Sequence, residues 1–312
     1  MNIQQFQYVL AVAEQRHYEQ AAEKCFVTQS TLSTMISRFE EEIGIRIFDR
    51  KKKPVEVTAE GKQILYQLGV IMADIDQLKE LSKEVKGEIS GKVTLSVIPT
   101  VAPFLLPLFL QDFASRFPNL RITVREQTTG EILRALKSRD LDMGIVSVPL
   151  NDKELRESKM YDEHFVFYDA GAHPKKNVKI NELDTSKLFL LEEGHCMRTQ
   201  VLKLCDIRNR KASNRQLNFE YKAGSIDSLL RFVRTNKATT LLPFLATVGM
   251  PADEMECIST FKKPIPYRSI GIVTHQHFAK KKILQILEKE IIEKVNELIS
   301  PASSLGVLMQ PY

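Results

Sequence analysis

The sequence lacks several features that mark whole classes of protein. Its 312 residues include only four cysteines, no apolar run of membrane-spanning length and no glycine-rich phosphate-binding loop. The N-terminal residues also lack the basic start and small-residue cleavage site of a secretory signal. We therefore expect a cytoplasmic protein with no membrane association, whose thiols are normally reduced and form no permanent disulfide framework.

Signs of catalysis or of a bound metal are also missing. No Ser/His/Asp pattern is evident, and among the histidines only His195 lies close to a cysteine, whereas a metal site needs several ligands at short spacing. The sequence therefore predicts no metal, no cofactor and no enzyme. A transient disulfide that acts as a sensor remains open.

The charge balance is mildly basic, with a net charge of +5. This value alone is weak support for a nucleic-acid partner. The positive charge gathers in one short stretch, "RIFDRKKKP", which a solvated turn would explain equally well. The basic residues of this stretch are Arg46, Arg50, Lys51, Lys52 and Lys53.

Three short helical patterns open the chain and favour a helix-turn-helix. The third pattern, "VTQSTLSTMISRFEEEIG", has Thr28 as a candidate N-cap and Gly44 as a candidate stop. A recognition helix places its N-terminal side chains against base edges in the major groove. A three-helix packing unit with a polar cap is the alternative that this pattern leaves open. The candidate DNA-contacting residues of this helix are Thr28, Gln29, Ser30, Thr31 and Ser33.

A basic hairpin and a long helix follow. Two β-prone pieces flank the proline-bearing turn, which predicts a wing whose tip, Arg50 to Lys53, meets phosphates. From Thr58 to about Val85 the chain predicts one amphipathic helix, whose apolar stripe needs a second surface to cover it. A second copy of the chain would provide that surface and match two DNA half-sites, so we expect a homodimer. The stripe consists of Ile64, Leu65, Leu68, Ile71, Ile75, Leu78 and Leu81.

Strand and helix patterns alternate after a polar hinge at about residues 86–92. This alternation predicts two linked α/β lobes built on parallel sheets, with a ligand cleft at the carboxyl ends of the strands. The late segment "RSIGIVTH" and the helix after it are expected to return to the first lobe, and the tail is expected to be loosely ordered. The predicted domains are a winged helix-turn-helix (1–58), a linker helix and hinge (59–91), an effector domain (92–300, with lobe I at about 92–163 plus 267–300 and lobe II at about 164–266) and a tail (301–312).

The stretch "LLEEGHCMRTQVLKLC" holds two cysteines nine positions apart. Cys196 falls where a helix would begin, beside His195 and Arg198, and a helix start stabilises a thiolate. We therefore expect a lowered thiol pKa at Cys196. Cys205 follows apolar residues and is expected to be a buried, inert thiol. Two core thiols without a function are the plain alternative.

Much of the chain resembles the LysR-type transcriptional regulators. The resemblance is carried by the "AAE" helix, the "TQSTLS" start of the third helix, "EEEIGIRIFDR" and "VTAEG". It implies a periplasmic-binding-protein-like effector domain of two lobes. Ser30 replaces a proline that is common in the family, at little cost, because proline is favourable but not required there. Asn236 and Lys237 replace glycines in a later turn, which leaves its geometry open.

A narrower resemblance is to the peroxide-sensing subgroup called OxyR. It is carried by "SVIPTVAPFLLP", by "GHCMRTQ" with a cysteine nine positions on, by "TLLPFLAT" and by "RSIGIV". The resemblance implies that Cys196 reacts with hydrogen peroxide and that Cys205 resolves it as a disulfide. It also implies a peroxide pocket around the thiol, in which we favour Thr128 over Thr129. The other implied pocket residues are Thr100, His195 and Arg268; a plain salt bridge is the alternative for Arg268.

Helix geometry then bears on the implied disulfide. If residues 196–205 stayed helical, the two Cα atoms would lie roughly 13 Å apart, whereas a disulfide needs them within about 7 Å. The bond would therefore require this segment to be remodelled. The resemblance implies a peroxide-responsive regulator of oxidative-stress genes, of the activator type. The resemblance adds RNA polymerase as a partner and a homotetramer as the assembly, and a LysR-type regulator with a small organic effector remains the alternative.

Overall fold

The computed structural model describes most of the chain. The described residues are 1–85, 89–171, 177–183, 187–204, 221–299 and 306–311. They divide into two compact units, Met1–Lys86 with Ser138–Asp140, and Gly87–Lys137 with Leu141–Tyr312. No helix in the described part of the chain is long and apolar enough to cross a membrane.

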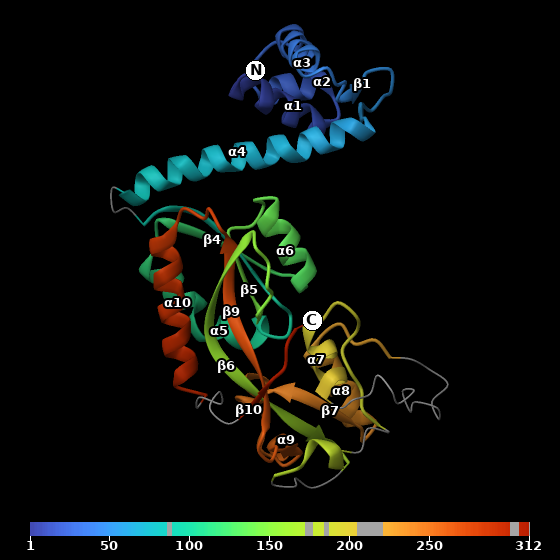
Figure 1. Cartoon of the computed structure of the whole chain (residues 1–312), viewed down its shortest axis with the longest axis vertical. Helices are drawn as coiled ribbons and strands as arrows, with labels where there is room; N and C mark the ends of the chain where they lie inside the picture. Colours follow the sequence, from blue (N-terminus) through green and yellow to red (C-terminus); the bar gives the residue numbers. More distant parts are fainter. Residues whose placement is uncertain (86–88, 172–176, 184–186, 205–220, 300–305, 312) are drawn as a thin grey trace. The chain divides into compact units, whose positions relative to one another are not determined.

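The first unit is a winged helix-turn-helix, as the sequence predicts (Figure 1). The third helix begins after Thr28, whose hydroxyl accepts a hydrogen bond from the backbone N–H of Thr31, and it ends at Gly44 in a left-handed conformation with φ of 69°. Both boundaries agree with the sequence-based expectation. The elements are α1 (Ile3–Gln15), α2 (Tyr18–Lys24), α3 (Gln29–Ile43), β1 (Phe48–Asp49), β2 (Glu56–Val57) and α4 (Ala59–Val85).

The long helix α4 buries only the first part of its apolar stripe within this unit. Leu68 is fully buried against the helix-turn-helix core, and Ile64, Leu65 and Ile71 pack around it. Further along, Leu78 and Leu81 are exposed in the single chain. The second half of the stripe is therefore left without a covering surface in one protomer.

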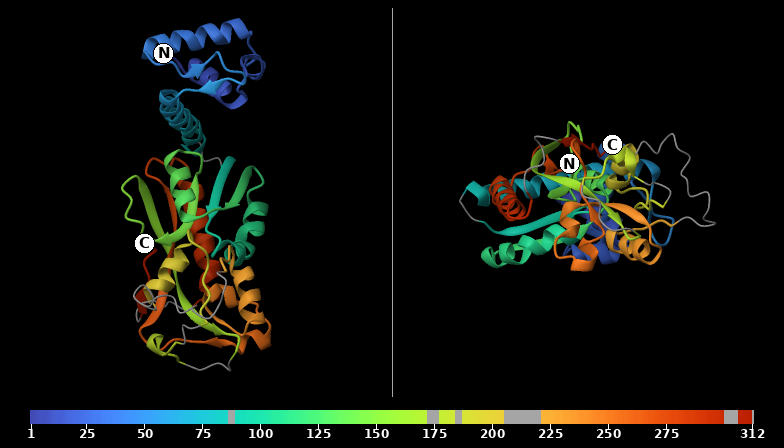
Figure 2. Two further views of the ribbon diagram at one scale, coloured as in Figure 1. Left: turned by 90° about the vertical axis from the view of Figure 1, so that its right-hand side faces the viewer. Right: turned by 90° about the horizontal axis from the view of Figure 1, so that it is seen from below.

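The second unit is built on a curled mixed sheet. Its strands follow the order β4-β3-β5-β9-β6-β7, with β10 beside β9 and β8 beside β6. Helices pack on this sheet and complete two lobes (Figure 2). The strands are β3 (Gly91–Val97), β4 (Leu120–Glu126), β5 (Met143–Val148), β6 (Leu155–Asp169), β7 (Thr239–Pro243), β8 (Ile258–Ser259), β9 (Ile265–His275) and β10 (Gly306–Leu308); the helical elements are α5 (Ala102–Arg116), α6 (Thr129–Lys137), η1 (Ile180–Glu182), α7 (Cys196–Leu204), α8 (Ile226–Thr235), η2 (Phe244–Thr247), α9 (Ala252–Met255) and α10 (Lys281–Asn296).

The sheet is not parallel throughout, and this part of the prediction is wrong. β3 pairs in parallel with β4 and β5, but β9 runs antiparallel to both β5 and β6. The reason is the route of the chain: β6 leaves the first lobe for the second and β9 makes the return journey beside it, so the two must run in opposite directions. The predicted return of "RSIGIVTH" to the first lobe is confirmed, because this segment is β9 (Figure 1, Figure 2).

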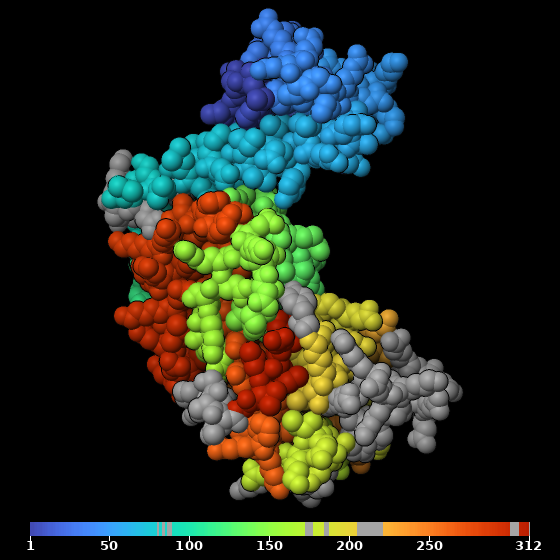
Figure 3. Space-filling view, viewed as in Figure 1, coloured from blue at the N-terminus to red at the C-terminus, as the bar shows by residue number. Residues whose placement is uncertain are grey.

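Residues 306–311 of the C-terminal tail are ordered, although the sequence indicated a loosely ordered segment. β10 lies parallel to β9, and the Met309 backbone N–H donates to the Tyr267 carbonyl at 2.7 Å. Met309 itself is buried in the core of the second lobe. In Figure 3 the red C-terminal residues lie at the surface next to the yellow residues of α7.

Two local details complete the second unit. The segment "KLFLLEE" forms isolated bridges, Leu188 to Thr239 and Leu191 to Ala223. In the turn where glycines were replaced, Lys237 takes a positive φ of 47°, so a lysine here adopts the conformation that a glycine would favour.

Candidate functional site

The start of α3 presents the polar residues that the sequence assigned to DNA contact. Thr28, Gln29, Ser30 and Thr31 are exposed, and Ser33 is half-buried. The Thr28 hydroxyl is shared with its neighbours, at 3.0 Å from Ser30 Oγ and 2.8 Å from Thr31 Oγ1. The exposed hydroxyls and amide form a surface that could hydrogen-bond to base edges or phosphates.

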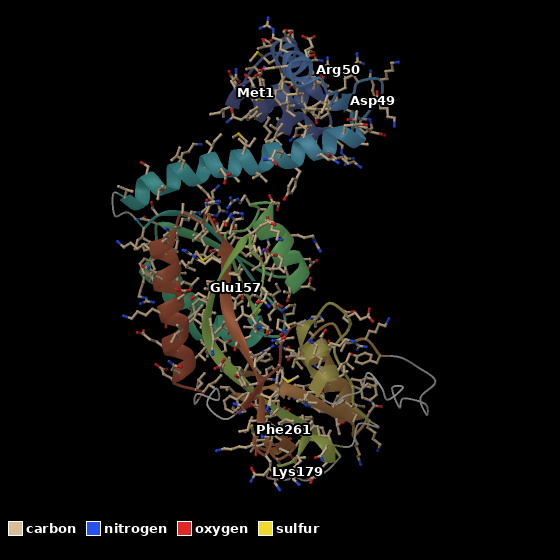
Figure 4. The ribbon with its side chains drawn as sticks, in the orientation of Figure 1. Met1, Asp49, Arg50, Glu157, Lys179 and Phe261 are labelled. Atoms are coloured by element: carbon tan, nitrogen blue, oxygen red, sulfur yellow. The ribbon has the colours of Figure 1, made fainter. Side chains whose placement is uncertain are left out.

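In the wing, Arg50 has a structural partner set that the sequence did not reveal. Its Nη2 donates to Ser37 Oγ at 2.9 Å and to Glu40 Oε2 at 3.0 Å, and its guanidinium lies 5.5 Å from the centroid of the Tyr18 ring. Glu40 in turn accepts from the Ile47 backbone N–H at 2.7 Å. Arg50 thus anchors the hairpin to α3. Figure 4 labels Arg50 and the neighbouring Asp49 in the first unit.

The three lysines of the hairpin tip differ in their partners. All three are exposed. Lys52 forms an ion pair with Glu56 at 2.6 Å, and this partner raises the pKa of the Lys52 ammonium. Lys51 and Lys53 form no ion pair among the described residues. Their charges are therefore the more available ones for phosphate contact.

In the second unit, one small pocket gathers several of the predicted residues. Its walls come from the loop after β3, the start of α6 and the start of α7, so two of its three walls follow the carboxyl ends of parallel strands. The space between its walls is about 160 Å³ with open solvent included, and it encloses no room for a sphere the size of a water molecule. The lining residues are Ile98, Pro99, Thr100, Thr128, Thr129, Gly194, His195 and Cys196.

Cys196 is the first residue of α7 and is only 7% exposed. Burial raises the pKa of its thiol; the Arg268 charge, the Thr129 hydroxyl and the backbone N–H groups at the helix start act in the opposite direction without outweighing burial. This differs from the lowered pKa expected from sequence. The physical reason is that the favourable groups act on a thiol already withdrawn from water.

Arg268 is completely buried and touches the pocket wall. Its Nη1 donates to Thr100 Oγ1 at 2.9 Å and its Nη2 to the Thr100 carbonyl at 3.0 Å. Its Nε donates to Glu163 Oε2 at 2.9 Å. The two sequence-based readings of Arg268 therefore hold together, since it is both a salt-bridge partner and a neighbour of the thiol pocket.

Two adjacent threonines at the start of α6 have different roles in the structure. The Thr128 hydroxyl donates to Glu131 Oε2 at 2.7 Å and lowers the pKa of that carboxyl. Thr129 is 3% exposed, and its hydroxyl makes no hydrogen bond of ordinary geometry within the described residues. It nevertheless lies close enough to the Cys196 thiol to lower the pKa of that group. The geometry therefore favours Thr129, rather than Thr128, as the hydroxyl available to the thiol.

His195 directly precedes Cys196 and is also buried. Burial lowers the pKa of its imidazole, against the opposing effect of Glu192, so the ring is neutral at neutral pH. A neutral imidazole can either donate or accept a hydrogen bond inside the pocket. The imidazole of His195 therefore adds a hydrogen-bonding group to the pocket but no positive charge beyond that of Arg268.

Neither Cys25 nor Cys257 lines the pocket. Cys205 lies outside the described residues, which end at Leu204 in this region. Cys25 and Cys257 are half-buried free thiols that pack against the cores of the first unit and of the second lobe. No group of three or more metal-binding side chains occurs within the described ranges.

Comparison with protein families gives matches over both units. Residues 3–62 match the bacterial regulatory helix-turn-helix protein of the lysR family, and residues 86–288 match the LysR substrate binding domain. The second match alone spans more than half of the chain, and together the two spans include most of the helix-turn-helix and the thiol pocket.

Individual relatives extend the comparison. The DNA-binding transcriptional dual regulator OxyR of Escherichia coli K12 is 31% identical over 88% of this chain and 89% of its own length. The HTH-type transcriptional regulator EstR of Acinetobacter baylyi is 33% identical over 78% and 80%, respectively. Among solved structures, a full-length OxyR variant from Pseudomonas aeruginosa superposes with a TM-score of 0.74 at 26% identity, covering 97% of this chain and 99% of that one.

Proposed function

The chain belongs to the LysR family of bacterial helix-turn-helix regulators, and from this premise we propose that it senses hydrogen peroxide through Cys196 and regulates oxidative-stress genes. The observation that carries the proposal is a buried cysteine at a helix start, enclosed with Thr100, Thr129 and His195 in one pocket. The names of several relatives point to the same signal.

The pocket has no room for an organic effector. Pockets for organic ligands usually measure about 300–1,000 Å³, whereas the walls around Cys196 leave no enclosed space of the size of a water molecule. Any ligand must therefore push the side chains apart to enter, and hydrogen peroxide, with only two heavy atoms, requires less displacement than an organic effector.

The proposed first step is an attack on peroxide by the Cys196 thiolate. The sulfur bonds to one peroxide oxygen, the O–O bond breaks, and the second oxygen leaves as hydroxide, which takes up a proton to become water. Sulfur is oxidised by two electrons and peroxide is reduced by two. The Thr129 hydroxyl and the Arg268 charge lie where they could stabilise the thiolate, and His195 is placed to supply a proton or a hydrogen bond.

In the proposed second step Cys205 condenses with the Cys196 sulfenic acid. The Cys205 sulfur displaces the sulfenic oxygen, which leaves as water, and a disulfide forms. Because α7 is helical from Cys196 to Leu204, the Cα atoms of these two residues lie about 12 Å apart. A disulfide therefore requires α7 to unwind, and this local change is the conformational signal that we propose.

We further propose that the signal is read out on promoter DNA. The start of α3 and the lysines of the wing would contact the DNA, and the exposed half of the α4 stripe would pair two chains in a dimer. A dimer of dimers and contact with RNA polymerase complete this proposal. It assigns the sensing chemistry to one unit and the DNA contact to the other.

A second candidate is a LysR-type regulator of an organic effector, with an incidental cysteine. It is favoured by the 33% identity to EstR, a regulator whose name does not mention peroxide. The two candidates differ in what Cys196 does. Under the first the thiol is indispensable, and under the second it is replaceable.

A Cys196→Ser variant decides between them. We expect it to bind promoter DNA normally and to show no change in DNA footprint or transcription after peroxide, while Cys257→Ser, the matched control, responds as the parent does. Peptide mass spectrometry of the parent should show the Cys196–Cys205 disulfide. A Cys196→Ser protein that still answers peroxide would overturn the proposal.

A further inference from the structure

The carboxylate of Glu163 connects η2 to β9 near the thiol pocket. Glu163 is 1% exposed on β6, directly opposite Arg268 on β9. Its Oε2 accepts from Arg268 Nε at 2.9 Å, and its Oε1 accepts from the Leu245 backbone N–H at 2.8 Å. A continuous chain of hydrogen bonds thus runs from Leu245 in η2 through Glu163 and Arg268 to Thr100 after β3.

Only a carboxylate satisfies this arrangement. Both oxygens of Glu163 accept hydrogen bonds from fixed donors, and an amide has one oxygen acceptor and one NH₂ donor. A glutamine at this position would therefore lose either the Arg268 contact or the Leu245 contact. The charge is also needed, because Arg268 is a fully buried cation for which Glu163 is the carboxylate partner recorded in the structure.

We propose that Glu163 is a positioning residue for the peroxide reaction: it holds the Arg268 guanidinium in the orientation that reaches Thr100 and the Cys196 pocket. Glu163 does not line the pocket and would not touch peroxide. It acts through Arg268, whose side chain is long and can turn away when its Nε partner is removed. This inference rests on the proposed function for the reaction that Arg268 serves.

Because Glu163 and Arg268 carry opposite charges, the direction in which the Cys196 pKa moves in a Glu163 variant tests the inference. Arg268 favours the Cys196 thiolate, whereas a nearby negative charge such as that of Glu163, taken alone, would disfavour a thiolate on general electrostatic grounds. If Glu163 only contributed charge, Glu163→Gln would make the thiol more acidic. If Glu163 positions Arg268, the same substitution displaces the guanidinium and makes the thiol less acidic.

The experiment measures the Cys196 thiol in the full-length protein. The alkylation rate of Cys196 against pH, followed by peptide mass spectrometry, gives its ionisation midpoint, and the same peptide reports the rate of oxidation by peroxide. For Glu163→Gln we expect the midpoint to rise towards that of Arg268→Gln, and the peroxide rate to fall by about tenfold or more at equal ionisation, within the range that a small misplacement causes. A midpoint that falls or stays unchanged overturns the proposal.

Two further variants protect the test against simple misfolding. Glu163→Asp keeps the charge and withdraws the carboxylate by one methylene, so positioning predicts a raised midpoint and a charge effect predicts none. Asp162→Asn is the matched control: Asp162 is the neighbouring carboxylate on β6, but its partners are Ser269 at 2.6 Å and Lys159 at 2.8 Å. We expect Asp162→Asn to leave both readouts as in the parent, whereas a shift equal to that of Glu163→Gln would count against a specific role of Glu163.

A double variant tests whether Glu163 acts through Arg268. Glu163→Gln combined with Arg268→Gln should react with peroxide no more slowly than Arg268→Gln alone, since neighbours that act as one unit are not additive. Additive losses would contradict the inference. If the parent thiol reacts with peroxide no faster than free cysteine, the proposed function fails, while the alkylation midpoints still decide the role of Glu163.

Discussion

Gln200 on α7 donates a hydrogen bond to the carbonyl of Met309 at 2.7 Å, although the two residues are 109 positions apart in sequence. The same Nε2 donates to Ser147 Oγ on β5 at 3.0 Å, and Gln200 is fully buried. The helix that begins with Cys196 is therefore tied both to the central sheet and to the C-terminal segment. A change at the tail should be felt in α7.

Gly306→Val tests this connection. A Cβ at Gly306 would collide with the Ile265 carbonyl and the Tyr267 ring, so β10 should detach from β9. The Gln200 amide would then lose the Met309 carbonyl as a hydrogen-bond acceptor and keep only Ser147. We expect this loss to lower the free energy of unfolding by about 1–3 kcal/mol. We expect faster amide hydrogen exchange in residues 196–204 and earlier urea unfolding. Val307→Thr, at an exposed neighbour, is the control, and unchanged exchange in α7 would show that the tie is unimportant.

The basic residues of the wing should differ in their roles, since Lys51 and Lys53 are expected to contact DNA phosphates and Arg50 to hold the hairpin in place. Lys51→Ala and Lys53→Ala should each reduce the slope of log affinity against log salt by about one for promoter DNA, because each removes one phosphate contact. Thermal stability should not change. Fluorescence anisotropy at several salt concentrations measures the slope. Lys79→Ala removes the same charge from α4, where Lys79 pairs with Asp76 at 2.7 Å, and should leave the slope unaltered.

Arg50→Ala should behave differently from the lysine variants. It removes the hydrogen bonds to Ser37 and Glu40 that hold the hairpin to α3. A hydrogen bond to a charged group contributes about 1.5–3 kcal/mol, so we expect a lower melting temperature of the first unit in addition to weaker DNA binding. A melting temperature equal to that of Lys51→Ala would contradict an anchoring role for Arg50.

The exposed half of the α4 stripe should govern association of the chain. Leu78 is 68% exposed, and Leu78→Lys would place a charge within the proposed dimer seam. We expect light scattering to show a lower mass at a concentration where the parent is dimeric. Asp76→Asn changes the net charge equally on the opposite face of the helix and should not alter the mass. If Leu78→Lys keeps the parent mass, the dimer seam lies elsewhere.

The Cys196 thiol should make stability dependent on alkaline pH. Burial raises the folded-state pKa of this thiol, so the folded protein holds the proton more tightly than the unfolded chain does. The resulting stabilisation is fully present below the pKa of the unfolded thiol, about 8.5, and is lost as the pH rises through the folded pKa. The free energy of unfolding should therefore fall more steeply with rising pH in the parent than in Cys196→Ser, by at most about 1.4 kcal/mol per pH unit. Urea unfolding at a series of pH values measures this slope. Parallel curves would show that the thiol is not buried as described.

The sequence predicted the first unit well because its signals are local. Thr28 and Gly44 mark the ends of α3 through their own side chain or lack of one, and the fold around them needs no distant partner. The pocket was predicted in part, since Thr100, His195, Cys196 and Arg268 were each named from resemblance. Whether these residues perform the chemistry assigned to them remains a prediction.

Other features depend on pairings that a sequence pattern does not display. The Glu163–Arg268 contact follows from the register of β6 against β9, residues 105 positions apart. The choice between Thr128 and Thr129 depends on how α6 starts, because Glu131 occupies one hydroxyl and leaves the other to face the thiol. The tail was missed because a three-residue edge strand has no periodicity and needs only a glycine that fits beside β9.

The place of β9 has a consequence for how the protein is made. This strand lies between β5 and β6 and carries Arg268, yet it is synthesised after all of β1 to β8. Domains generally fold in order of synthesis, and the first unit draws nearly all of its residues from Met1–Lys86. The DNA-binding unit can therefore fold while the sensor is still unfinished, and the thiol pocket acquires its buried cation only after the elements of the second lobe have been made.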